Sequence, residues 1–336
     1  MATVALAILV AGPAYTQGTI APVENPNQPP PHTKPWPNIA AGEGRAAIND
    51  SLAQSPEFER NTSPLDLLRE RRRLDAALSQ VKAQRPGTVD AYVLTVALDS
   101  DPVFAREARE AAKVLSRRYG AQGRTITLAG PDGKSNELPK GSIRSLLTTL
   151  AHIGSLMDGD EDVLVLYSTS HGLQQGLAYH YGDTGYGVLS PDRFKAALEE
   201  LGIERRVLII SACYSGVFVP KLASDNTAIL TASADNRTSF GCRAENDWTY
   251  FGDAMINRAL RKPQSLEEAS QEANLSIAEW ETRAGVFASL PQIKIGDNVD
   301  QWMPALTARM PRQASAPVGR PAAGEFASRE PIPAAR

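Results

Sequence analysis

The chain has few of the residues that mark metal-binding, disulfide-rich or nucleic-acid-binding proteins. Among 336 residues it holds two cysteines and four histidines. No Cys-x-x-Cys, His-Glu-x-x-His or glycine-rich phosphate-binding motif is present in the sequence, so neither a metal nor a nucleotide cofactor is predicted. The 35 Lys and Arg residues against 38 Asp and Glu leave no positive excess of the kind that nucleic-acid-binding proteins carry. Neither DNA nor RNA is therefore an expected partner.

The two ends of the chain differ in composition from a globular domain. Residues 4–11 are apolar and too short to span a bilayer, and they predict a signal peptide over residues 1–18, although no Lys or Arg precedes Lys34. A periplasmic or secreted location follows from that prediction, and no stable membrane span is expected. Seven prolines between residues 21 and 37 predict an extended linker over residues 19–50. A Pro- and Ala-rich end predicts a disordered tail over residues 304–336.

Between these ends, short apolar runs alternate with amphipathic stretches. Continuous apolar runs rich in β-branched residues predict strands that are buried on both faces, as in parallel sheets. The strands are predicted at residues 92–98, 125–128, 163–167, 207–210 and 228–232, and the helices at 63–81, 101–119, 142–157 and 190–201. A hairpin is predicted over residues 176–188. The alternation indicates one α/β domain over residues 89–303, a three-layer sandwich preceded by a helical segment over residues 51–88.

Two residues with reactive side chains follow two of these strands. His171 ends the run Ser-Thr-Ser-His-Gly, and Cys213 lies in Ser-Ala-Cys-Tyr-Ser-Gly. Because the carboxyl ends of parallel strands form the ligand crevice of an open sheet, the two side chains are expected to meet there. A thiol beside an imidazole predicts a cysteine nucleophile with a histidine base. The N–H groups of Gly172 and Cys213 are predicted to form the oxyanion hole.

Other candidate motifs are weaker. Asp183-Thr184-Gly185 matches the tripeptide of aspartic proteases, but it occurs once and within the predicted hairpin, which favours a turn. Ser215 lacks the Gly-x-Ser-x-Gly context of a serine nucleophile. Cys242 is predicted to be a small buried residue, with a regulatory disulfide to Cys213 as the alternative.

The contexts of His171 and Cys213 resemble those of the legumain (asparaginyl endopeptidase) family of cysteine peptidases, which are relatives of caspases. Segments 231–235, 239–242 and 249–253 follow in the order that bacterial members of this family show. The resemblance covers roughly residues 89–302 and implies a caspase-like three-layer sandwich with a mostly parallel central sheet.

The resemblance also implies a pocket for the residue that precedes the cleaved bond. Asp253, in a Tyr-x-Gly-Asp context, matches an acid of that pocket, and Ser239 matches a second position. Arg106 lies near, but not at, the position of the family's pocket arginine. Ser211 stands where the family has an acid two residues before the cysteine. All four residues are predicted to bind substrate.

The asparagine that orients the histidine in legumain has no clear counterpart in this chain. Asp99, Asp101 or a backbone carbonyl could take that role. The function predicted is that of a cysteine endopeptidase, which hydrolyses peptide or protein substrates after Asn or Asp through an acyl-enzyme on Cys213. The alternatives are an inactive peptide-binding module of the same fold and a transpeptidase.

Overall fold

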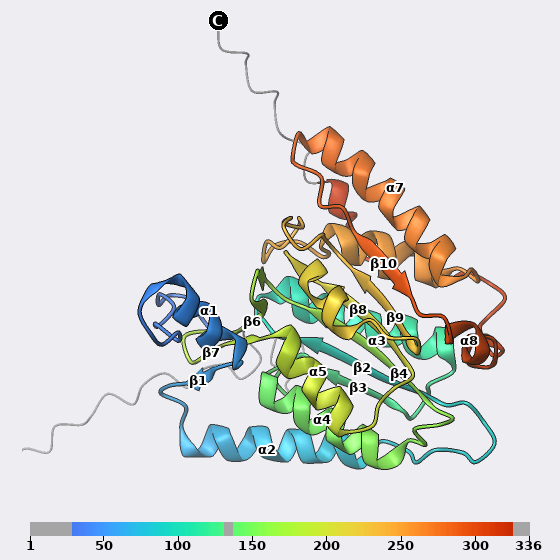
Figure 1. Ribbon diagram of the computed structural model, residues 1–336, viewed down its shortest axis with the longest axis horizontal. Coiled ribbons are helices and arrows are strands. Elements are labelled where there is room, and N and C mark those ends of the chain that lie inside the picture. Colours follow the sequence, from blue (N-terminus) through green and yellow to red (C-terminus); the bar gives the residue numbers. More distant parts are fainter. Residues whose placement is uncertain (1–28, 131–136, 325–336) are drawn as a thin grey trace, which may run out of the picture.

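The computed structural model describes residues 29–130 and 137–324 (Figure 1). The predicted signal peptide and the first part of the predicted linker lie outside the described residues. Within the described ranges, no helix is long and apolar enough to cross a membrane.

A six-stranded sheet forms the centre of the molecule. Its strand order is β10-β9-β8-β4-β2-β3, and all neighbours are parallel except β10 and β9. The strands are β2 (Ala91–Ala97), β3 (Thr125–Leu128), β4 (Val163–Thr169), β8 (Arg206–Ser211), β9 (Thr227–Thr231) and β10 (Gln292–Ile295). The first five coincide with the predicted strands. β10 was not predicted, because it is a short edge strand in which Gln and Lys alternate with Ile.

Helices cover both faces of this sheet, which confirms the predicted three-layer α/β architecture with a mostly parallel sheet. Side chains of β4 alternate between the two faces: Val165 packs in one hydrophobic cluster and Leu166 in the other. The first cluster draws on α3 (Pro102–Tyr119), the π-helix η2 (Gly252–Arg258), η3 (Ala259–Arg261), α7 (Leu266–Ala284) and α8 (Val299–Thr307). The second draws on α2 (Pro64–Ser79), α4 (Ile143–Leu156), α5 (Pro191–Glu200), η1 (Ser215–Phe218) and α6 (Val219–Leu222).

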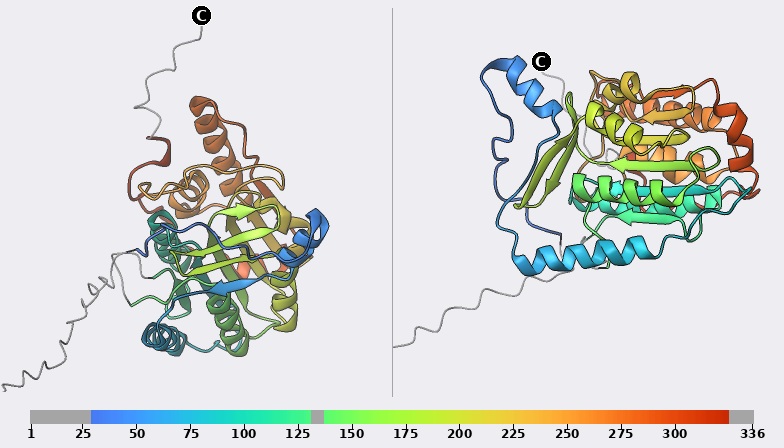
Figure 2. Two further views of the ribbon diagram at one scale, coloured as in Figure 1. Left: turned by 90° about the vertical axis from the view of Figure 1, so that its left-hand side faces the viewer. Right: turned by 60° about the horizontal axis from the view of Figure 1, so that its bottom comes forward.

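A smaller antiparallel sheet continues from the carboxyl end of β4. Its order is β1-β7-β6-β5, and it lies with α1 at one end of the molecule (Figure 2). The elements are α1 (Gly44–Ala53), β1 (Glu57–Glu59), β5 (Gly172–Leu173), β6 (Gly176–Tyr181) and β7 (Gly185–Leu189). β6 and β7 form the predicted hairpin. β1 falls within residues 51–88, which were expected to be helical, and α1 begins within residues 19–50, which were expected to be an extended linker.

The described part of the predicted tail, residues 304–324, differs from the expected disorder. Helix α8 continues to Thr307. The carbonyl oxygen of Val318 accepts hydrogen bonds from Trp248 Nε1 at 2.8 Å and from Asn257 Nδ2 at 3.0 Å. The side chain of Ala322 is buried in the first hydrophobic cluster. Composition alone did not predict this packing, because the segment is anchored by backbone groups and small side chains.

Candidate active site

The candidate nucleophile and base follow adjacent parallel strands at the same edge of the central sheet. Thr169 of β4 is paired with Ser211 of β8. His171 and Cys213 each come two residues after these paired positions. They lie close enough for the charge of each to change the pKa of the other. The structure thus brings the two side chains to one place, as the pattern of strand ends predicted.

Gly172 lies directly against the backbone of Cys213. A Cβ atom on Gly172 would stand 1.8 Å from the Cys213 carbonyl oxygen and 3.0 Å from its nitrogen, so only glycine fits. The two backbone segments are therefore in contact at the point where β5 begins. This contact places both candidate oxyanion N–H groups at the same edge.

The sulfur of Cys213 lies among hydrogen-bond donors. The backbone N–H of Ser239 donates to Sγ at 3.2 Å, and the Ser239 hydroxyl lies 3.7 Å away. A hydrogen bond from Cys242 is the largest of the effects that lower the pKa of Cys213 to about 6; the Ser239 donors and the His171 charge also lower it, while burial opposes them. A thiol with this pKa is mostly thiolate at neutral pH.

The backbone at Cys213 is held in an unusual conformation. Tyr214 has a φ of 57°, in the left-handed region that a residue with a large side chain rarely adopts. Its N–H donates to the Arg237 carbonyl oxygen at 2.8 Å, which fixes the turn. Strained backbone of this kind is concentrated at functional sites.

His171 is paired with an acid on its other side. Its Nε2 lies 3.8 Å from Asp101 Oδ2, which leaves Nδ1 as the nitrogen available to a neighbouring thiol. The His171 side chain is 45% exposed, so a substrate can reach it. Burial lowers the pKa of His171, but Asp101, Asp99 and Cys213 together raise it above its ordinary value. Of the three groups considered for orienting the histidine, the structure places Asp101 beside the ring.

A buried carboxylate that the sequence did not indicate lies under the site. Glu107 of α3 is fully buried and accepts hydrogen bonds from the hydroxyls of Ser211 at 3.2 Å and Thr249 at 3.0 Å, and from Tyr167. Burial raises its pKa to about 7, although these hydrogen bonds lower it. The signal in the sequence was an acid on the apolar face of α3, at helical spacing from Phe104 and Ala111.

The predicted substrate-binding residues are not all found in one place. Ser239 touches the sulfur of Cys213, as described above. Ser211 is 2% exposed and bonds Glu107 and Thr249, so it lies below the surface that a substrate could contact. Arg106 donates to the carbonyl oxygens of Ala244 and Asn246, and its guanidinium thereby holds the loop that follows Cys242.

Asp253 differs most from its predicted role. Its side chain is fully buried, and its carboxylate accepts hydrogen bonds from Asn257 Nδ2 at 2.9 Å, Arg258 Nε at 3.2 Å and the Ala322 backbone N–H at 2.9 Å. These partners belong to its own helix and to the C-terminal segment. The carboxylate is thus engaged in packing, and no part of it is open to a substrate.

Comparison with known proteins agrees with this geometry. Residues 144–301 match the family model described as the Peptidase C13 family, which is the legumain family. This match includes His171 and Cys213 and confirms the resemblance to that family over this segment. It supports a cysteine-type peptidase that acts on protein or peptide substrates.

One solved structure that resembles the chain is caspase-1 from Spodoptera frugiperda. The two are 13% identical in sequence, with a TM-score of 0.43, and the match covers 64% of this chain and 88% of that chain. A search of the curated proteins gave no match.

Proposed function

We propose that the chain is a cysteine endopeptidase in which Cys213 is the nucleophile and His171 the general acid and base. The Cys213 thiolate attacks the carbonyl carbon of the scissile peptide bond, and His171 protonates the departing amine. Water, deprotonated by His171, then hydrolyses the thioester and releases the thiol. The N–H groups of Gly172 and Cys213 stabilise the negative oxygen of the tetrahedral intermediates.

One observation carries this proposal. His171 and Cys213 follow register-paired residues of adjacent strands, and the sulfur accepts the Ser239 N–H at 3.2 Å. That donor, together with Cys242, favours the thiolate. A structural cysteine has no need of a lowered pKa, an adjacent imidazole and a glycine contact at its backbone.

For specificity, we infer a preference for Asn over Asp before the cleaved bond. The support is the resemblance to the legumain family and the carboxylate of Glu107, which the Ser211 hydroxyl connects to the Cys213 strand. An Asn side chain is neutral and can donate hydrogen bonds, whereas an Asp carboxylate is repelled by a nearby negative charge. Glu107 is as buried as Asp253, so it would act on the substrate through its charge and not by contact.

The decisive test compares purified wild-type protein with the Cys213→Ala and Cys242→Ala variants on a panel of fluorogenic peptides. The panel places Asn, Asp, Gln or Ala before the reporter. Wild type and Cys242→Ala are expected to hydrolyse the Asn peptide, and Cys213→Ala is expected to be inactive while folded. Labelling by a peptide acyloxymethyl ketone should likewise require Cys213.

The same experiment separates the alternatives. A peptide-binding module would bind the panel, with no turnover by any variant. A transpeptidase would join the acyl group to an added amine such as a glycyl peptide in preference to water, and mass spectrometry of the products distinguishes the two outcomes. Hydrolysis that persists in Cys213→Ala would overturn the assignment of the nucleophile.

A further inference from the structure

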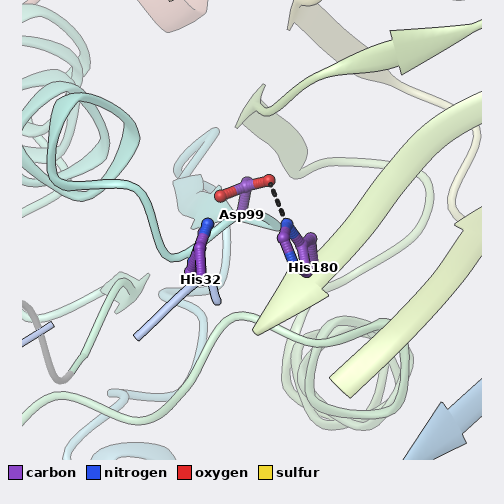
Figure 3. A group of neighbouring side chains, drawn as sticks. All are labelled: His32, Asp99 and His180. Carbon is purple, nitrogen blue, oxygen red and sulfur yellow. Dashed lines mark ion pairs between the residues drawn. The ribbon is translucent and has the colours of Figure 1, made fainter. Parts of the chain in front are cut away.

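A cluster of two imidazoles and a carboxylate lies next to the candidate active site, and none of the three residues takes part in a step of the proposed reaction. His32, Asp99 and His180 each offer one ligand atom, and these atoms lie within 4.8 Å of one another. The rings of His32 and His180 stand on either side of the Asp99 carboxylate (Figure 3). The three residues come from the N-terminal segment, from the loop that follows β2 and from the hairpin strand β6.

The carboxylate of Asp99 is buried, and only one of its two oxygens accepts a hydrogen bond. Its side chain is 1% exposed. Oδ1 accepts a hydrogen bond from the Asp101 backbone N–H at 2.8 Å, whereas Oδ2 has no hydrogen-bond partner among the described residues. A buried carboxylate oxygen without a hydrogen-bond partner is costly, and a position beside two imidazoles suits a bound cation.

The spacing of Asp99 and His180 fits metal ligands better than a hydrogen bond. Asp99 Oδ2 and His180 Nδ1 lie 3.4 Å apart. A charge-assisted hydrogen bond would bring such atoms to about 2.7–2.9 Å. Zinc binds His nitrogen and carboxylate oxygen at about 2.0–2.2 Å with tetrahedral angles, which places neighbouring ligand atoms roughly 3.3 Å apart.

The ring of His32 is oriented by a second contact. Its Nε2 lies 2.8 Å from the Ser100 hydroxyl, which itself accepts the Gly182 backbone N–H at 2.9 Å. Nδ1, on the other side of the ring, lies 3.3 Å from Asp101 Oδ1. A histidine that binds a metal through one nitrogen commonly uses the other in such a hydrogen bond, which fixes the tautomer and the angle of the ring.

We propose that His32, Asp99 and His180 bind a divalent transition metal ion of the zinc class. Two imidazoles and one carboxylate form a donor set that suits Zn²⁺, with a fourth position left for water. The ion joins the N-terminal segment to the peptidase domain, because His32 is the ligand that comes from outside that domain. These three residues would bind the ion whether or not Cys213 acts as a nucleophile.

The site also lies beside the candidate catalytic histidine. Asp101 has one oxygen 3.3 Å from His32 Nδ1 and the other 3.8 Å from His171 Nε2. A metal ion that fixes His32 therefore fixes the N-terminal segment next to His171. We therefore expect residues 29–60 to be better ordered when the metal is bound, because the metal links them to the edge of the active site.

The test uses the full chain, made without a polyhistidine tag, in the Cys213→Ala background so that the catalytic thiol cannot capture the metal. After chelator treatment and removal of the chelator, Zn²⁺ is titrated calorimetrically, and Co²⁺ is added as a visible-absorption probe of tetrahedral nitrogen and oxygen ligation. One equivalent per chain is expected. His32→Ala and Asp99→Asn should each weaken binding by at least about tenfold.

Two controls make the result specific. Asp99→Asn retains a side-chain oxygen that can accept the Asp101 N–H, so a loss of binding in this variant is not a loss of fold. His152→Ala removes a histidine of α4 that bonds the Leu78 carbonyl oxygen at 3.0 Å, and it should bind Zn²⁺ as its parent does. Zn²⁺ should also slow limited proteolysis of residues 29–60 in the parent and leave it unchanged in Asp99→Asn. Absence of binding, or equal affinity in all variants, would overturn the site.

Discussion

The hydroxyl of Ser211 lies 3.2 Å from the carboxylate of Glu107, and this contact joins the strand that carries Cys213 to helix α3. In the family that the chain resembles, position 211 holds an acid. Here a serine occupies that position, and the carboxylate is supplied from Glu107 on α3 instead. The carboxylate that Ser211 contacts thus comes from a helix, and the sequence around Cys213 gave no sign of it.

Glu107 should make the choice between Asn and Asp peptides depend on pH. Because its pKa is raised to about 7, Glu107 is charged at pH 8 and largely neutral at pH 6. The Asp of a substrate, with a pKa of about 3.9, stays charged at both. The ratio of kcat/KM for Asn over Asp peptides should therefore fall as the pH drops from 8 to 6. In Glu107→Gln the ratio should not change with pH, and an equal slope in both proteins would contradict this role.

Glu107 should also affect stability, and the sign follows from its raised pKa. The folded protein binds a proton at Glu107 up to a pH of about 7, whereas the unfolded chain loses it near 4.5. The free energy of unfolding should therefore fall as the pH rises from 5 to 8, by on the order of 3 kcal/mol from this group. Denaturant unfolding of Cys213→Ala and of Cys213→Ala with Glu107→Gln measures it. The difference between their pH profiles isolates Glu107, because neither protein has the Cys213 thiol, whose titration acts in the opposite direction.

Cys242 should tune the reactivity of Cys213. Its hydrogen bond is the largest effect that lowers the pKa of Cys213 to about 6. The rate of alkylation by iodoacetamide should therefore rise with pH through about 6 in the wild type. In Cys242→Ala the same rise should occur at higher pH. Above that pH the variant should still turn over substrate. Ser239→Ala is the comparison variant: it keeps the backbone donor and removes only a hydroxyl 3.7 Å from the sulfur, so its profile should shift less than that of Cys242→Ala. If the pH profile of alkylation were the same in Cys242→Ala as in the wild type, the contribution of Cys242 would be refuted.

The sequence predicted those parts of the site that depend on strand ends. Apolar runs gave the positions of β4 and β8, and parallel pairing then required the residues after them to meet at one edge. Gly172 was predicted from the same pattern. These inferences are local in sequence, and the geometry of a parallel sheet supplies the rest.

Sequence could not predict contacts that depend on how separate layers pack. The carboxylate of Glu107 reaches Ser211 across 104 positions of the chain. His32 reaches Asp99 and His180 from a proline-rich segment that composition classed as a linker. In both cases the side chains that meet come from elements far apart in the sequence, so no short motif indicates that they are neighbours.

Asp101 should position His171 for catalysis. Their charged atoms lie 3.8 Å apart, so the carboxylate helps to hold the ring and to stabilise the imidazolium that protonates the departing amine. Asp101→Asn should lower kcat by about tenfold or more and leave KM nearly unchanged, because the contact matters most when the ring is charged. Asp192→Asn, at an exposed acid paired with Lys221, serves as the control and should have wild-type kinetics. A rise in KM with kcat unchanged would show that Asp101 acts on substrate binding instead.

Asp253 should contribute to stability more than to specificity. Its buried carboxylate pairs with Arg258 at 3.2 Å and accepts the Ala322 N–H at 2.9 Å. Asp253→Ala leaves these donors without a partner and should lower the free energy of unfolding by roughly 3 kcal/mol. At a temperature where the variant is still folded, its ratio of kcat/KM for Asn over Asp peptides should equal that of the wild type, whereas Glu107→Gln should change the ratio and not the fold. Denaturant unfolding and peptide kinetics on the two variants decide the matter. A stable Asp253→Ala protein that no longer distinguishes Asn from Asp would return Asp253 to the pocket that the sequence first assigned to it.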